Sequence, residues 1–151
     1  MDRNVAILAG TGAAIAAVAA VAIAAKREGT SPLRPINASS HIVWGEKAGK
    51  ISDLDARHTA LGLAINVGAG FFWGSVMASL RSRRSDRSEA NIMSDAATVG
   101  LLASVVDYGI VPRRLSPGWE NAVSPASVVF GMASMAAGLA AGTWIAERQN
   151  R

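Results

Sequence analysis

Asp107 and His58 are the two residues of this sequence whose types and positions most readily suggest chemistry. Asp107 lies where one apolar segment ends, and His58 lies where another begins. An ionisable residue within or beside a membrane segment is costly to bury and is a functional candidate by default. Other polar residues fall on the same side of these segments. The sequence therefore predicts one polar cluster, made of His58, Asp107, Tyr108, Arg113, Arg114 and Glu120.

Three roles are open for Asp107. The favoured role is a structural clamp, in which the carboxylate accepts hydrogen bonds from His58 or pairs with Arg57, Arg113 or Arg114. The second role is a binding site for a proton or a ligand. The third is a solvated carboxylate without a partner. Each role predicts a different response to replacement of the aspartate.

Patterns typical of metal sites and catalytic sites are missing. His41 and His58 could join Asp107 or Glu120 around a metal ion, but no ligand spacing supports this. The sequence has no nucleophile elbow, phosphate-binding loop or Ser-His-Asp order. It has no cysteine, which excludes disulfides and thiolate catalysis. We therefore expect no cofactor, no metal and no enzymatic activity.

The composition indicates a membrane protein. Half of the 151 residues are hydrophobic and 17% are charged, whereas soluble domains are about 25% charged. The apolar residues form long blocks, and the basic residues that give the net charge of +4 lie between them. Basic residues placed in this way act as topology signals or contact anionic lipid. No basic face with interleaved aromatic residues is present, so we expect no nucleic-acid partner.

Four apolar segments predict an all-α membrane protein, a small bundle of four transmembrane helices in one domain, 1–151. The first helix would span about 33 Å, enough for a bilayer core of about 30 Å. We favour a retained helix here over a cleaved signal peptide, because the apolar run is long. The loop 26–52 allows a short interfacial helix with Ile42, Val43 and Trp44 against lipid. The predicted helices are 4–25, 53–80, 91–111 and 125–146.

Local signals predict where three of these helices begin or end. "SDLD" reads as a capping box, with Ser52 as the N-cap and Asp55 at the third helical position. Pro112 ends the third segment, because the residue before a proline avoids helical geometry. Ser124 followed by Pro125 is a strong start signal for the fourth.

Small residues at four-residue spacing predict close helix packing. They form one ridge in the second segment and another in the fourth. Asn66 lies within the first ridge, and an unpaired amide in a membrane is costly, so it should face another helix. The predicted packing residues are Gly62, Asn66, Gly70, Gly74, Gly138 and Gly142.

The arrangement of basic residues predicts the orientation. With four crossings, both termini and the loop 80–91 share one side, and the loops 26–57 and 112–121 share the other. Lys and Arg are nearly balanced in number between the sides, so dual topology stays open. Density favours a cytoplasmic location for "RSRRSDR" and the termini. That cytoplasmic basic loop contains Arg81, Arg83, Arg84 and Arg87, and Asp95 nearby should pair with one of its arginines.

The stretch from His58 to Glu120 resembles the YagU-like group of small bacterial inner-membrane proteins. The shared pattern is a helix that begins at a histidine, a short loop, and a helix that ends in a polar residue before P-x-x-L-[ST]-P. Here the end of that pattern is carried by Asp107, Pro112, Leu115, Ser116 and Pro117. The resemblance implies an inner-membrane location and a helical architecture, and no activity.

The leading functional prediction is a non-enzymatic inner-membrane protein that packs with itself or with a larger membrane complex. The main alternative is a small oligomeric transporter or channel for a proton, ion or small solute, using Asn66 and Asp107. A membrane enzyme that acts on lipid at the His58 and Asp107 interface is a weaker third hypothesis.

Overall fold

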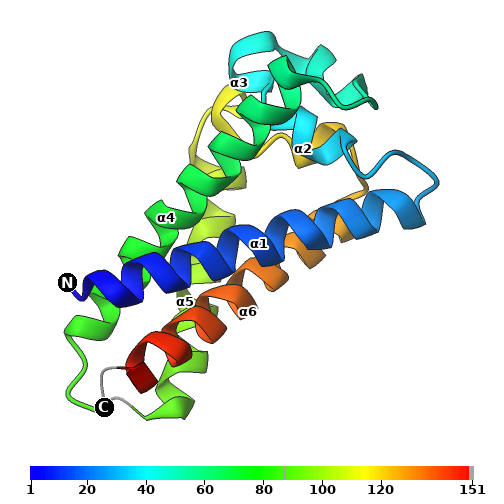
Figure 1. The fold of residues 1–151 in the computed structure, drawn as a ribbon. Coiled ribbons are helices and arrows are strands. Elements are labelled where there is room, and N and C mark those ends of the chain that lie inside the picture. Colours follow the sequence, from blue (N-terminus) through cyan, green and yellow to red (C-terminus); the bar gives the residue numbers. More distant parts are fainter. Residues whose placement is uncertain (87, 150–151) are drawn as a thin grey trace. The chain divides into compact units, whose positions relative to one another are not determined.

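The computed structural model describes residues 1–86 and 88–149, and within them every regular element is a helix. This confirms the all-α prediction. Figure 1 shows the elements in chain order. The longer helices are α1 (Arg3–Arg27), α4 (Leu61–Ser82), α5 (Glu89–Val105) and α6 (Pro125–Gln149). The short elements are α2 (Arg34–Ala38), α3 (His41–Trp44), η1 (Glu46–Lys50), η2 (Ala56–Ala60), η3 (Val106–Ile110), η4 (Arg113–Leu115) and η5 (Trp119–Asn121).

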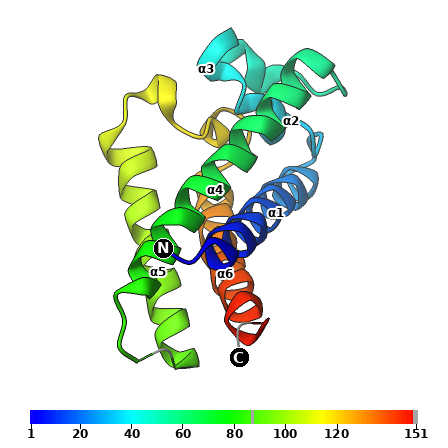
Figure 2. The same cartoon turned by 60° about the vertical axis from the view of Figure 1, so that its left-hand side comes forward.

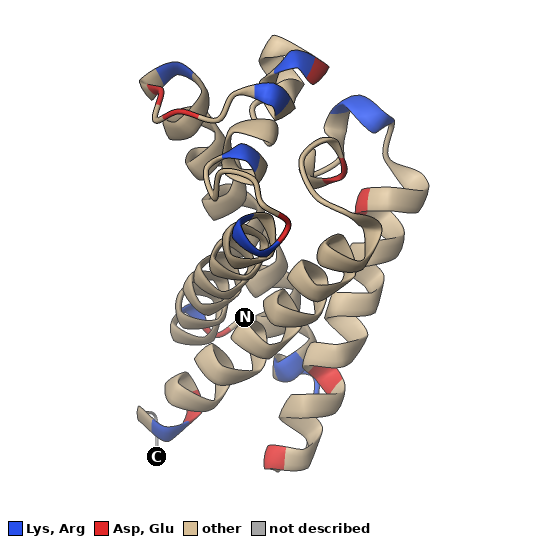
Figure 3. Cartoon of the chain, turned by 90° about the vertical axis from the view of Figure 1, so that its right-hand side faces the viewer, with Lys and Arg blue, Asp and Glu red and all other residues tan. Residues whose placement is uncertain are grey.

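Three helical stretches are long and apolar enough to cross a membrane. They are Arg3–Arg27, Ala56–Ser82, which joins η2 to α4, and Pro125–Gln149. In Figure 3, most charged residues lie in the connections and near helix ends, and the middle of α1, α4 and α6 carries none. The third predicted segment is not among these stretches; its regular α-helix, α5, ends at Val105 and continues as the π-helical turn η3.

The chain divides into two compact units. Unit 1 comprises Met1–Ala17, Val67–Ala103 and Met132–Arg151, and unit 2 comprises Val18–Asn66 and Ser104–Gly131. Each unit combines pieces of several helices that are far apart in the sequence. The prediction of one domain over 1–151 stays a prediction.

Backbones approach closely in unit 1 at several buried glycines. Figure 2 shows α4 and α5 as antiparallel neighbours. A Cβ on Gly74 would meet the backbone of Gly10 in α1, and a Cβ on Gly142 would meet the carbonyl of Leu8. Gly138 packs on Gly12 in the same way. Only residues without a side chain permit such separations, which is why small residues recur at membrane helix interfaces.

Unit 2 wraps short helices around the first turns of α4. Gly62 lies against the carbonyl of Ile36 in α2. Gly118 lies against the carbonyl of Ala38 and has a φ of +83°, a left-handed conformation that other residues rarely adopt. The region predicted to hold one short interfacial helix contains α2, α3 and the 3-10 turn η1 instead.

The structure corrects one helix start and confirms another. Asp55, not Ser52, is the N-cap of the second segment, and its carboxylate accepts the Arg57 N–H at 2.9 Å. The capping-box prediction was wrong because the carbonyl of Ser52 is held by the Ser31 hydroxyl at 2.6 Å, outside the helix. The predicted start of α6 is confirmed, since Ser124 Oγ accepts the Ser127 N–H at 3.4 Å and Pro125 is the first helical residue.

Candidate functional site

A buried ionic cluster joins three helices of unit 1, and we define it as Arg81, Arg84, Asp95 and Glu147. Arg81 donates from Nε and Nη2 to the two carboxylate oxygens of Glu147, each at 2.9 Å. Its Nη1 donates to Asp95 Oδ2 at 3.1 Å. Arg84 Nη2 donates to Asp95 Oδ1 at 2.6 Å. Two positive and two negative side chains therefore neutralise one another between α4, α5 and α6.

Burial makes this cluster matter for stability. The side chains of Arg81 and Asp95 are 1% and 0% exposed, and Glu147 is 7% exposed. A charge so far from water is tolerated only when it is paired and hydrogen-bonded. Arg84 is partly exposed, and the hydrogen bond to Asp95 raises the pKa of its guanidinium further. The cluster is a strong interhelical clamp.

The sequence anticipated only part of this cluster. The pairing of Asp95 with an arginine is confirmed. Arg81 is corrected from the basic loop to the last turn of α4, where its side chain is buried. Arg83 is exposed beyond that helix, and Arg87 lies outside the described residues. Glu147 was missed, although it follows the buried Thr143 by four positions and so continues a buried stripe of α6.

Two buried asparagines connect α4 and its first turn to the α2 region in unit 2. Asn66 Nδ2 donates to Ser39 Oγ and to the Gly62 carbonyl, both at 2.8 Å. Asn37 Nδ2 donates to the carbonyls of Ile51 and Asp53 at 2.9 and 3.1 Å. The partner of Asn66 therefore comes from the segment between α2 and α3, not from another long helix. Asn37 and Ser39 were not predicted, since nothing in their spacing marks them.

His58 pairs with the N-cap residue of its own helix. Its Nδ1 bonds to Asp55 Oδ2, and this hydrogen bond is the main cause of a lowered pKa for the Asp55 carboxyl. Arg57 stacks over the ring of Trp44 at 3.7 Å from the ring centroid. Two of the groups proposed as partners of Asp107 therefore make other contacts.

Asp107 and Tyr108 lie together in the π-helical turn η3. Asp107 is half-buried, and Tyr108 is exposed. The π geometry adds one residue to this last turn of the helix. Pro112 follows the turn and stops the helix. The roles suggested for Asp107 stay predictions.

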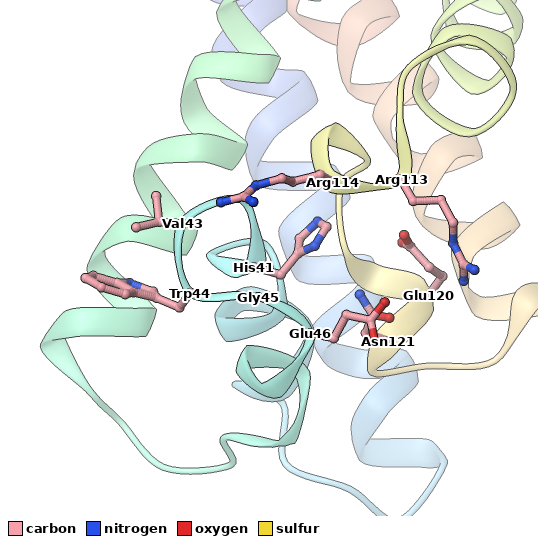
Figure 4. Close-up of a pocket in the computed structure, with 9 residues that line it drawn as sticks. All are labelled: His41, Val43, Trp44, Gly45, Glu46, Arg113, Arg114, Glu120 and Asn121. Carbon is pink, nitrogen blue, oxygen red and sulfur yellow. The ribbon is translucent and has the colours of Figure 1, made fainter.

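Three members of the predicted polar cluster line one pocket of about 360 Å³ in unit 2 (Figure 4). They are Arg113, Arg114 and Glu120, and the same pocket is lined by His41, Trp44 and Glu46. The short elements position these side chains: α3 and η1 contribute one wall, and η4 and η5 contribute the other.

Hydrogen bonds fix the floor of this pocket. The buried His41 donates from Nε2 to the Ser116 carbonyl at 3.0 Å, since a carbonyl can only accept. Ser116 Oγ also bonds to Glu120 Oε1. Arg114 Nε donates to the Ile42 carbonyl at 3.2 Å, which ties the two walls together. His41, Arg114 and Glu120 are thus held in place in this pocket.

Glu28 forms a separate polar contact at the start of α6. Its carboxylate accepts from Ser127 Oγ at 2.5 Å, from Ser124 Oγ at 2.7 Å and from the Ser124 N–H at 3.1 Å. The hydrogen bond from Ser127, followed by that from Ser124, lowers the pKa of Glu28. A negative charge at a helix N-terminus is also favoured by the helix dipole.

Comparison with known protein families, with curated proteins and with solved structures gave no match for this chain. Within residues 1–86 and 88–149, no three His, Asp or Glu side chains are grouped so that they could hold a metal ion.

Proposed function

We propose that this chain is a multi-pass protein of the bacterial inner membrane with four crossings, made by α1, α4, α5 and α6. The placement of side chains by size supports this proposal. Alanines and glycines make up much of the buried faces of the long helices, and many large apolar residues point outward. Water would penalise such exposure, but lipid tails accept it without cost. Outward-facing examples are Ile7, Ile15, Phe72, Leu101, Val129 and Ile145.

The same reasoning extends to α5, which is shorter than the other three. Met93, Leu101, Leu102 and Val105 are all exposed on it, and Ile110 is exposed in η3. Together α5 and η3 cover Glu89–Ile110, a length of about 33 Å at 1.5 Å per residue. That length suits a bilayer core of about 30 Å.

We further propose a structural or accessory role without enzymatic activity, in which the chain packs with itself or within a larger membrane complex. One observation carries this proposal: the buried charged groups of α4, α5 and α6, and the buried Asn66, are all bonded to partners within the fold. The ionic cluster is neutral, and Asn66 is bonded to Ser39 and Gly62. A group held in this way stabilises the protein and is poorly placed to bind or pass a solute. The termini and the loop around Arg83 would face the cytoplasm.

Flux measurements on purified protein in liposomes would test this role against a transporter or channel. The structural role predicts that proton and ion flux equals that of protein-free liposomes. It also predicts a particle heavier than one chain after extraction in mild detergent. Flux that is lost in both Asn66→Leu and Asp107→Asn would contradict the structural role and favour transport.

A further inference from the structure

We propose that the pocket lined by His41, Trp44, Glu46, Arg113, Arg114 and Glu120 binds the headgroup of a phospholipid that carries both a phosphate and a primary amine. The inference rests on the membrane location proposed above. It assigns a ligand to a site that the structural role does not use.

Opposite charges face this pocket without neutralising one another. Arg113 and Arg114 contribute guanidinium groups, and Glu46 and Glu120 contribute carboxylates. Within residues 1–86 and 88–149, neither arginine takes part in any ion pair. Figure 4 shows these side chains around one opening. A ligand with a negative and a positive group complements this arrangement better than a simple anion, which the carboxylates would repel.

The donors and acceptors suit phosphate and amine in particular. Guanidinium groups present a planar fork of N–H donors that matches phosphate oxygens. Arg114 donates to Ile42 through Nε, and among residues 1–86 and 88–149 its terminal nitrogens make no other hydrogen bond, so they can reach a ligand. The exposed Glu46 carboxylate can accept from a primary ammonium group, which has three donors, but not from a quaternary one, which has none.

Apolar side chains beside the pocket indicate a lipid and not a free solute. Val43 and Trp44 line it and are 49% and 40% exposed. Leu115 follows Arg114 in η4 and is 54% exposed. Tryptophan beside polar groups is typical of the membrane–water interface. The volume, about 360 Å³, falls within the range of ligand pockets and is ample for a headgroup.

Lipid-dependent melting of the delipidated protein in detergent tests this inference. Phosphatidylethanolamine should raise the melting temperature at lower concentration than phosphatidylglycerol, which lacks the amine, or phosphatidylcholine, whose ammonium cannot donate. Soluble phosphoethanolamine and inorganic phosphate should need far higher concentrations, because they lack acyl chains. Equal effects of phosphatidylethanolamine and phosphatidylglycerol would overturn the amine assignment. Equal potency of phosphoethanolamine and the lipid would overturn the lipid assignment.

Variants at exposed positions test whether the lipid-dependent rise in melting temperature comes from this pocket. Arg113→Gln combined with Arg114→Gln should raise the half-maximal phosphatidylethanolamine concentration about tenfold or more, as expected for lost charge-assisted hydrogen bonds. Glu46→Gln should remove the advantage of phosphatidylethanolamine over phosphatidylglycerol. Arg83→Gln, at another exposed arginine, is the matched control and should behave like the parent. An unchanged lipid response in the double variant would overturn the site.

A separate measurement distinguishes failure of the site from failure of the proposed location. If alkaline carbonate releases the chain from membranes, the membrane proposal fails, whatever the pocket binds. If the chain stays in the membrane and no lipid preference appears, only the headgroup inference fails.

Discussion

Arg81 and Glu147 form a two-armed ion pair that joins the last turn of α4 to the last turns of α6, with both N–O distances at 2.9 Å. Both side chains are buried, and Arg81 reaches Asp95 of α5 with its remaining nitrogen. A single arginine thus connects three helices of unit 1.

Replacing one partner of this ion pair should destabilise the protein strongly. Glu147→Leu leaves Arg81 buried with one carboxylate, which Arg84 already shares. We expect a loss of about 3–5 kcal/mol, typical when one partner of a buried ion pair is removed. Thermal or denaturant unfolding of the detergent-solubilised protein would measure it.

Removing both partners should be milder than removing one. In the double variant Arg81→Met, Glu147→Leu, Asp95 keeps Arg84 and no unpaired charge is left buried. Arg148→Ala is the matched control, because Arg148 is exposed and its contact with Glu89 is long, at 3.5 Å. It should change stability by less than about 1 kcal/mol. A double variant that is less stable than Glu147→Leu would show that the cluster is not a simple clamp.

Two glycines of α4 should respond in opposite directions to the same substitution. A Cβ on Gly74 would collide with the backbone of Gly10, whereas a Cβ on Gly68 would meet open space. Gly74→Ala should therefore cost about 1–3 kcal/mol through overpacking. Gly68→Ala should be neutral or stabilising by up to about 1 kcal/mol, since alanine favours the helix. Equal melting temperatures for the two variants would mean that the Gly74 face does not pack on α1.

Asn37 should contribute more to the stability of the fold than its sequence context suggests. Asn37→Ala removes the donor to two carbonyls, those of Ile51 and Asp53, and the acceptor for the Thr59 hydroxyl. Buried groups left without partners cost about 1–3 kcal/mol. Hydrogen exchange should increase in residues 51–59 of the variant. The control Asn121→Ala, at a half-buried position, should leave exchange there unchanged, and a similar increase in both variants would argue against these specific bonds.

The Glu28 cap predicts a particular pH dependence. Its folded-state pKa is lowered by the hydrogen bonds from Ser127 and Ser124, so the ionised carboxylate contributes stability at neutral pH. That contribution is present above the unfolded-state pKa, about 4.3 for glutamate, and is lost as the pH falls through the lower folded-state value. Glu28→Gln should melt below the parent at pH 7, and the difference should shrink below about pH 4. A difference that stays constant between pH 7 and pH 3 would exclude this cap.

The helical class and the approximate positions of the long helices could be predicted, because apolar runs and start signals are local. Ser124 and Pro125 mark the beginning of α6 through contacts within one turn. The α4 helix was harder to delimit, because Ser52 and Asp55 are both good caps. The choice between them depended on Ser31, which is distant in the sequence and bonds to Ser52.

The polar sites were predicted less completely, because partners far apart in the sequence determine them. Arg81 looks like one of several loop arginines until Glu147 is found beside it. His58 was expected to meet residues of another segment, yet its partner Asp55 is three positions away. In contrast, Arg113, Arg114 and Glu120 lie in one short connection, and the structure places them along one pocket.

Cysteine labelling across α5 tests the central proposal of four membrane crossings most directly. The chain has no cysteine of its own, so a single introduced cysteine is the only one that the reagent can label. Substitutions at the exposed residues Lys47, Arg83 and Leu115 therefore show on which side of the membrane each residue lies. If α5 crosses, an impermeant thiol reagent applied to intact cells will label Lys47→Cys and Leu115→Cys, and Arg83→Cys will resist it. If Leu115→Cys and Arg83→Cys behave alike while Lys47→Cys differs, α5 does not cross, and the four-helix proposal is wrong.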